Sequence, residues 1–175
     1  EGLGHAYIRV ERWDDALKAF NAILVHHRDA LTNAEVVDLF AQMGDLLEHT
    51  NQLDKARRQY EKALEVEPQH SSSLRQLANI LEKTGDFENA YDFRNKYVDV
   101  APREERVGVL LSLAQLSREH LKDPYRSIDA LLEAQKLDAK NVDVLEALVQ
   151  LYTDTKQAAK VADLTEQLWE LVPDA

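Results

Sequence analysis

The 175-residue chain contains no cysteine, and only five glycines and four prolines. The lack of cysteine excludes a disulfide framework and thiolate chemistry at a metal or a nucleophile. So few helix breakers favour a helix-rich chain. No run approaches the roughly 20 apolar residues that span a bilayer, and no basic and then apolar leader opens the sequence. We expect a soluble protein, in the cytoplasm rather than the cell envelope, although the lack of cysteine is compatible with either compartment.

Basic residues are scarce relative to acidic ones. Lys and Arg number 21 against 32 Asp and Glu, which gives a formal net charge of −11. Nucleic-acid binding draws its affinity from cations that neutralise phosphates, so this balance argues against a nucleic-acid partner. The simpler interpretation of the acidic surface is that it keeps the chain soluble.

Sequence motifs for catalysis and metal binding are also missing. The chain has no Gly-rich phosphate loop, no HExxH and no Gly-x-Ser-x-Gly. His26 and His27 are adjacent, so on a helix they point about 100 degrees apart, and no third ligand is spaced nearby. The pairs Glu48-His49 and Glu119-His120 diverge in the same way and are predicted to be solvated residues near helix ends. We expect no enzyme activity, no cofactor and no metal site.

What the chain does contain is a pattern with a period of 34 residues. Pro68 and Pro102 are 34 residues apart, as are Ala56 and Ala90. Such a period is typical of stacked structural repeats. Between residues 37 and 70 the pattern places Met43, Gly44 and Leu47 on a first helix, Leu53 at a turn, Ala56, Tyr60 and Ala63 on a second helix, and Pro68 at its end. At these positions the segment resembles the tetratricopeptide repeat.

Four more copies resemble the same repeat, over approximately residues 1–30, 71–104, 107–140 and 142–175. Their matching residues are Leu3, Gly4, Tyr7, Trp13, Ala16, Phe20 and Ile23 in the first; Leu77, Ala78, Leu81, Phe87, Ala90 and Pro102 in the third; Leu113, Ala114, Ser127, Leu131 and Ala134 in the fourth; and Leu148, Val149, Tyr152, Val161, Thr165, Leu168 and Pro173 in the fifth. The third copy has Arg94 where the second helix should carry an aromatic residue. Small residues such as Gly44 let the two helices of a repeat cross closely, and large ones fill the space beside them.

The resemblance implies an all-α fold, a right-handed superhelical α-solenoid of antiparallel helix pairs. About four and a half repeats would form one domain over residues 1–175, in a bacterial-type array or a fragment of one. The period breaks at residues 26–36, since Gly4 and Gly44 are 40 residues apart. Either a helix is prolonged there or a loop is inserted, and we favour a loop because Thr32 or Asn33 suits the N-cap of the next helix.

The resemblance also implies a function in protein–protein interaction. First helices of such arrays line an inner groove in which a peptide or a partner helix commonly lies. The candidate groove residues, polar and facing outward from these helices, are Arg75, Gln76, Asn79, Lys83, Ser112, Gln115 and Arg118. Their cations and amides predict a scaffold or adaptor that grips an acidic or carboxylate-bearing stretch of its partner. An ordinary solvated helix face is the other interpretation.

The last helical stretch raises an alternative function. Leu164, Leu168 and Trp169 recur at helical spacing, and in a longer array a following helix would cover part of their face. We interpret the chain as a piece of such an array, with a homodimer through these candidate interface residues as a consequence. Self-association of a larger protein is therefore one alternative to peptide binding, and a regulatory segment attached to an enzyme is another.

Overall fold

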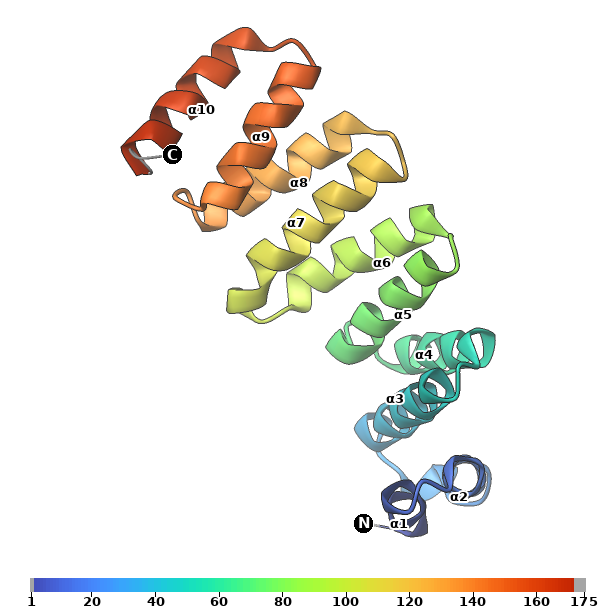
Figure 1. Cartoon of the computed structure of the whole chain (residues 1–175). Coiled ribbons are helices and arrows are strands. Elements are labelled where there is room, and N and C mark those ends of the chain that lie inside the picture. The colour runs from blue at the N-terminus through green and yellow to red at the C-terminus, as the bar shows by residue number, and fades with distance from the viewer. Residues whose placement is uncertain (1, 172–175) are drawn as a thin grey trace. The chain divides into compact units, whose positions relative to one another are not determined.

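The computed structural model describes residues 2–171, and the regular secondary structure of this part of the chain consists of helices joined by short turns and loops (Figure 1). The chain divides into two compact units, Glu1–Gly85 and Asp86–Ala175, which we call the N-terminal unit and the C-terminal unit. The division falls between the two helices of the third predicted repeat. Pro173, which the sequence placed at the end of the fifth repeat, lies outside the described residues. Each unit is described by itself below.

The helices follow one another in pairs, as the repeat pattern predicted. The N-terminal unit contains α1 (Leu3–Arg9), α2 (Trp13–His26), α3 (Asn33–His49), α4 (Leu53–Val66) and α5 (Ser71–Lys83), with a short 3-10 turn at Arg28–Ala30. The C-terminal unit contains α6 (Phe87–Val100), α7 (Arg103–Glu119), α8 (Pro124–Leu137), α9 (Val142–Asp154) and α10 (Ala158–Leu171). The closest pairs, α1 with α2, α3 with α4, α7 with α8 and α9 with α10, are the two helices of one repeat. The fold is thus an α-solenoid of helix pairs.

Each turn between the two helices of a repeat contains one residue in the left-handed conformation. These residues are Glu11, Asn51, Gly85, Lys122 and Lys156, with φ angles of 57°, 56°, 81°, 56° and 60°. Only glycine adopts this region without a steric cost, so four of the five turns carry some backbone strain. The recurrence of one conformation at five turns shows that the repeats share their backbone geometry.

The irregular stretch after the first repeat is a loop, as we favoured. Helix α2 ends at His26 and α3 begins at Asn33. Thr32 is the N-cap of α3: its Oγ1 accepts a hydrogen bond from the Glu35 amide at 3.3 Å, and the Glu35 carboxylate accepts one from the Thr32 amide at 2.8 Å. This capping box satisfies two donors that the helix start would leave unpaired.

Close helix crossing in the second repeat depends on Gly44. A Cβ atom at this position would stand 2.5 Å from the ring of Tyr60, which is itself fully buried. Gly4 of α1 meets the ring of Phe20 on α2 in the same way. The predicted role of the small residue is therefore confirmed in the first two repeats, where glycine makes room for an aromatic ring.

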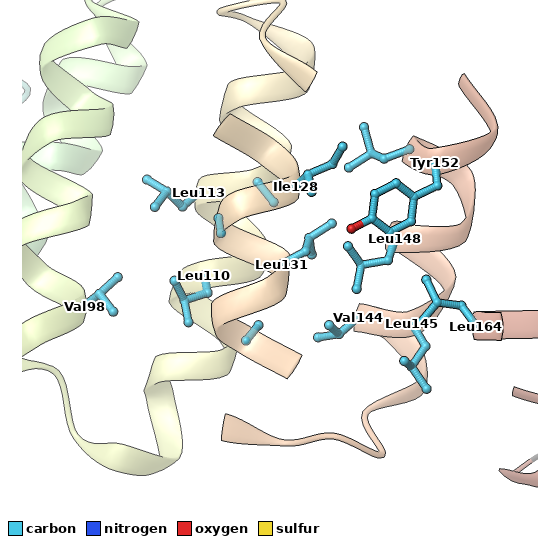
Figure 2. Close-up of a cluster of buried hydrophobic side chains, with 14 residues drawn as sticks. Val98, Leu110, Leu113, Ile128, Leu131, Val144, Leu145, Leu148, Tyr152 and Leu164 are labelled. Atoms are coloured by element: carbon cyan, nitrogen blue, oxygen red, sulfur yellow. The ribbon is translucent and has the colours of Figure 1, made fainter. Parts of the chain in front are cut away.

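The core of the C-terminal unit is built mainly from aliphatic residues, with the ring of Tyr152 among them (Figure 2). Leu110 and Leu113 of α7, Leu131 of α8, and Leu145 and Leu148 of α9 are at most 1% exposed. Figure 2 shows Leu131 lying in the layer between α7 and α9. Burying each of these side chains contributes roughly 1.5–3 kcal/mol, so this layer holds α7, α8 and α9 together.

Candidate functional site

The N-terminal unit contains an open cavity of about 740 Å³ on the side of α3 and α5. We call it the N-terminal pocket. Helix α3 supplies Gln42, Asp45, Leu46, Glu48 and His49, helix α5 supplies Ser72, Arg75 and Gln76, and the first repeat supplies Ile8 and Trp13. A volume of this order falls in the range of roughly 300–1,000 Å³ that is usual for ligand sites.

Helical spacing explains why these side chains share one face. Gln42, Asp45 and His49 follow one another at steps of three and four residues along α3, which places them on one stripe of that helix. On α5, Arg75 and Gln76 lie three and four residues after Ser72 and therefore share its face. Most buried leucines of both helices lie outside these stripes, and Leu46 borders the stripe of α3, so the polar side chains are left to face the pocket.

A polar network lies beneath the middle of the pocket. The Tyr60 hydroxyl of α4 donates to Asp45 Oδ1 at 2.6 Å, and Glu48 Oε2 lies 3.2 Å from the same oxygen. Lys83 Nζ donates to Glu48 Oε1 at 3.1 Å. Burial raises the pKa of Tyr60 far above its ordinary value, and the two carboxylates raise it further. Tyr60 therefore remains a neutral donor that holds both carboxylates in place.

Arg75 stands at the pocket with its side chain exposed, and no hydrogen bond or ion pair to another described residue engages it. Nearby, Gln42 has a buried Oε1 atom that no described residue satisfies. A guanidinium offers a planar set of donors that suits a carboxylate, and a carboxamide offers both donor and acceptor to a peptide backbone. The pocket thus presents free hydrogen-bonding groups.

One end of the pocket is apolar and aromatic. The rings of Trp13 and His49 meet edge to face with centroids 4.8 Å apart. Ile8 and Leu46 lie beside them in the pocket lining. An apolar side chain of a ligand finds its contacts here, next to the charged groups of α3 and α5.

The C-terminal unit contains a second and smaller cavity of about 240 Å³ between α7, α8 and α9. We call it the C-terminal pocket. Its floor and walls are Leu111, Ala114, Ser127, Leu131, Ala147 and Leu151, and Ser112, Gln115 and Arg118 complete the lining. The Ser127 hydroxyl is not free for a ligand, because it donates to the Ala114 carbonyl oxygen at 2.8 Å.

The candidate groove residues are thus found at two sites. Arg75 and Gln76 line the N-terminal pocket, and Ser112, Gln115 and Arg118 line the C-terminal pocket. Asn79 donates to Gln76 Oε1 at 3.3 Å and Lys83 is paired with Glu48, so these two act beside the N-terminal pocket rather than in its lining. One continuous strip from Arg75 to Arg118 stays a prediction, because the strip spans both units.

The sequence predicted the lining of the N-terminal pocket only in part. Glu48 and His49 were predicted to be solvated residues on the outward, groove-lining face of the second repeat's first helix. Glu48 is instead half-buried and bound to Lys83, while His49 packs on Trp13. Trp13 was assigned only to the repeat pattern, and Ile8 was not singled out at all. Helical spacing gave the outward positions of Asp45 and His49 and was also available for Gln42, whereas the approach of the first repeat to α3 depends on the irregular loop before Thr32.

The candidate oligomer interface is reduced by the structure. Leu164 is only 7% exposed and belongs to the core of the C-terminal unit, so it adds nothing to a surface. Leu168 is half-buried against the same core. Trp169, at 68% exposed, is the one large apolar surface group of the three.

Other features of the sequence have simple structural outcomes. His26 and His27 are exposed, and the described residues contain no group of three or more His, Cys, Asp or Glu side chains placed to hold a metal ion. His120 stacks on the ring of Phe87 with centroids 4.0 Å apart. Within the described part of the chain no helix combines the length and hydropathy needed to cross a membrane.

Paired helices with a recurring turn, close crossings at small residues and polar first-helix faces define an α-solenoid interaction module. Two models of the tetratricopeptide repeat match the chain, over residues 37–70 and 59–92. The first match has the same bounds as the repeat read from the sequence. Residues 37–92 thus consist of tetratricopeptide repeats, the family that the sequence pattern resembles.

Solved structures with the same fold cover nearly the whole chain. A MamA fragment from Desulfovibrio magneticus RS-1 is 18% identical with a TM-score of 0.61, and the match covers 99% of this chain and 94% of that one. Another MamA crystal structure is 10% identical with a TM-score of 0.66, covering 98% and 95%. YrrB, described as a tetratricopeptide-repeat protein with an unusual peptide-binding site, is 18% identical with a TM-score of 0.59, covering 90% and 76%. At these low identities, the structural similarity shows a shared fold. No curated protein matches the chain in sequence.

Proposed function

We propose that the chain is a binding module that holds an extended segment of a partner protein in the N-terminal pocket. The observation that carries this proposal is the unengaged guanidinium of Arg75 in a cavity of about 740 Å³ built from first-helix side chains. The fold supports it, since tetratricopeptide-repeat proteins are interaction scaffolds and YrrB is described as having a peptide-binding site. The partner segment carries an acidic side chain or a terminal carboxylate.

The pocket chemistry suggests how such a segment is oriented. Its carboxylate pairs with Arg75 on α5, and its backbone amides meet the carboxamides of Gln42 and Gln76. A neighbouring apolar side chain enters the end formed by Trp13 and Ile8. Asp45 on the opposite helix accepts from a basic residue of the segment, so a sequence with adjacent acidic and basic residues fits better than a purely acidic one.

Fluorescence anisotropy with labelled peptides tests this proposal. Peptides that combine an acidic, a basic and an aliphatic residue are titrated with the parent chain and with Arg75→Ala. We expect the substitution to weaken binding about tenfold, because a charge-assisted hydrogen bond is lost. Arg58→Ala is the matched control, since Arg58 is an exposed arginine of α4 outside the pocket lining. Equal affinity of the parent and Arg75→Ala would sink the proposal.

Self-association is a second candidate function, favoured by the exposure of Trp169 on α10. An exposed tryptophan beside the half-buried Leu168 is an apolar surface that a second copy can cover. Light scattering across a range of concentrations compares the parent with Trp169→Glu. We expect a dimer that the substitution converts to a monomer, with the free energy of unfolding of the monomer unchanged within about 0.5 kcal/mol because Trp169 is outside the core. A parent that stays monomeric at all concentrations removes this candidate.

A further inference from the structure

The second and fourth repeats have the same helices in the same register. Helices α3 and α7 are both 17 residues long with bounds shifted by 70 residues, and α4 and α8 are both 14 residues long with bounds shifted by 71. Gly44 therefore corresponds to Ala114, and Tyr60 corresponds to Leu131. The fourth repeat has lost both the glycine and the aromatic ring that pack together in the second.

The two losses are physically linked. A Cβ atom at Gly44 would lie 2.5 Å from the Tyr60 ring, so a repeat with alanine at this place has no room for a ring in the same arrangement. Leu131 is shorter than tyrosine, and the C-terminal pocket of about 240 Å³ lies beside Leu131 and Ala114. The pocket is thus a space that the fourth repeat does not fill with its own aromatic residue.

The pocket is the size of a single side chain. Small-molecule sites usually begin at roughly 300 Å³, above the volume found here. Three leucines, Leu111, Leu131 and Leu151, supply apolar walls, and the alanines at positions 114 and 147 leave the space between them open. Apolar walls with this spacing favour a flat ring over a charged or flexible group.

The two carboxylates of the second repeat are replaced beside this pocket by a neutral amide and a cation. Asp45 and Glu48, which hold the Tyr60 hydroxyl, correspond to Gln115 and Arg118. The Arg118 guanidinium has only long contacts, 3.5 Å to Gln150 Oε1 and 3.7 Å to Glu119 Oε1. Pairs of this length on a half-exposed arginine are weak and easily exchanged for a ligand carboxylate.

We infer that the C-terminal pocket binds one aromatic side chain of a partner protein, with a carboxylate next to that side chain on Arg118. The ring lies against Leu111, Leu131 and Leu151, and Gln115 hydrogen-bonds the backbone of the same segment. This inference rests on the proposed function, because it assigns the C-terminal unit its own part of the partner. The chain therefore binds two features of its partner: one unit binds an acidic site, and the other binds an aromatic–acidic pair.

Methyl NMR of the full chain tests the inference with the peptide acetyl-Gly-Phe-Glu-Gly-amide. We expect the methyl signals of Leu111, Leu131 and Leu151 to shift on titration. Peptides with Ala in place of Phe, or Gln in place of Glu, are the ligand controls and should bind about tenfold more weakly. Signals that do not shift, or that shift equally with the Ala peptide, overturn the inference.

Two variants locate the contacts. Arg118→Gln should weaken binding of the Phe-Glu peptide roughly fivefold to tenfold. Arg103 is an exposed arginine at the start of the same helix, and Arg103→Gln should leave the affinity unchanged. The double variant Ala114→Gly with Leu131→Tyr rebuilds the arrangement of the second repeat and should abolish the response by filling the pocket. If this double variant does not fold, Arg118→Gln alone decides, and an unchanged dissociation constant overturns the inference.

Failure of the proposed function is distinguishable in the same experiment. Arg75→Ala should leave the Leu131 response intact, because Arg75 belongs to the other unit. A loss of peptide binding at Arg75 with a retained response at Leu131 contradicts the proposed function only. Leucine signals that depend on protein concentration without peptide would show a second copy in the pocket, which overturns the assignment to a partner peptide.

Discussion

The second and fourth repeats build the same pair of helices but fill the space between them differently. In the second, the ring of a fully buried Tyr60 lies over Gly44, and its hydroxyl donates a hydrogen bond to Asp45. In the fourth, Leu131 packs beside Ala114 and a cavity remains. The comparison teaches that the repeat positions act in pairs: a ring on one helix requires the absence of a side chain on the other.

Truncation of the large residue should show the largest difference between the two repeats. Tyr60→Ala should lower the free energy of unfolding by about 3–5 kcal/mol, because it empties a filled core position. Leu131→Ala should cost about 2–3 kcal/mol, at the low end for leucine, because a cavity already adjoins it. Urea denaturation followed by circular dichroism measures both. A cost for Leu131→Ala equal to or above that of Tyr60→Ala would contradict the difference in filling.

A double-mutant cycle tests whether Gly44 and Tyr60 are coupled. Gly44→Ala should cost about 1–2 kcal/mol, since the clash with the ring outweighs the gain of about 1 kcal/mol in helix propensity. In the Tyr60→Leu background, which reproduces the pair of the fourth repeat, the same substitution should be neutral or stabilising. Denaturation midpoints of the four proteins give the coupling energy. A Gly44→Ala effect that is the same in both backgrounds would break the comparison.

Removal of the Tyr60 hydroxyl alone should have the smallest effect. Tyr60→Phe keeps the ring but leaves Asp45 and Glu48 without their shared donor, and we expect a loss of about 1 kcal/mol. The fourth repeat has no such hydrogen bond, so this variant makes the second repeat more like it. Thermal unfolding is the measurement, with Tyr91→Phe, a half-exposed tyrosine of α6, as the control. A stability loss above that of Gly44→Ala would show that the network, rather than the ring, dominates.

Much of the fold followed from the sequence because the repeat pattern has local causes. Thr32 and Glu35 cap α3 through contacts three residues apart, and Pro68 ends the second helix of its repeat through its own ring. Gly44 and Tyr60 were both recognised as packing residues. Such features depend on neighbouring residues in the chain or on the register of the repeats, and both can be identified in a single sequence.

The pockets followed only in part, because they depend on contacts between repeats. Arg75 and Arg118 were found from helical spacing, but Trp13 reaches the N-terminal pocket from another repeat, past a loop whose geometry no local signal defines. Leu164 was misassigned to a surface because periodicity shows that a residue lies on an apolar face, and does not show whether that face is the covered one. The C-terminal pocket is the space that Leu131 leaves unfilled, and an unfilled space between helices cannot be predicted from the residue type at any single position.

The contact of Lys83 with Glu48 links the N-terminal pocket to the packing of the third repeat on the second. Lys83 comes from the third repeat, Glu48 from the first helix of the second, and Glu48 also lies beside the Tyr60 hydroxyl from the second helix. One carboxylate thus joins three helices and at the same time borders the N-terminal pocket. A ligand cation at this carboxylate would compete with Lys83 for it, so the pocket and the contact between the second and third repeats share one charged group.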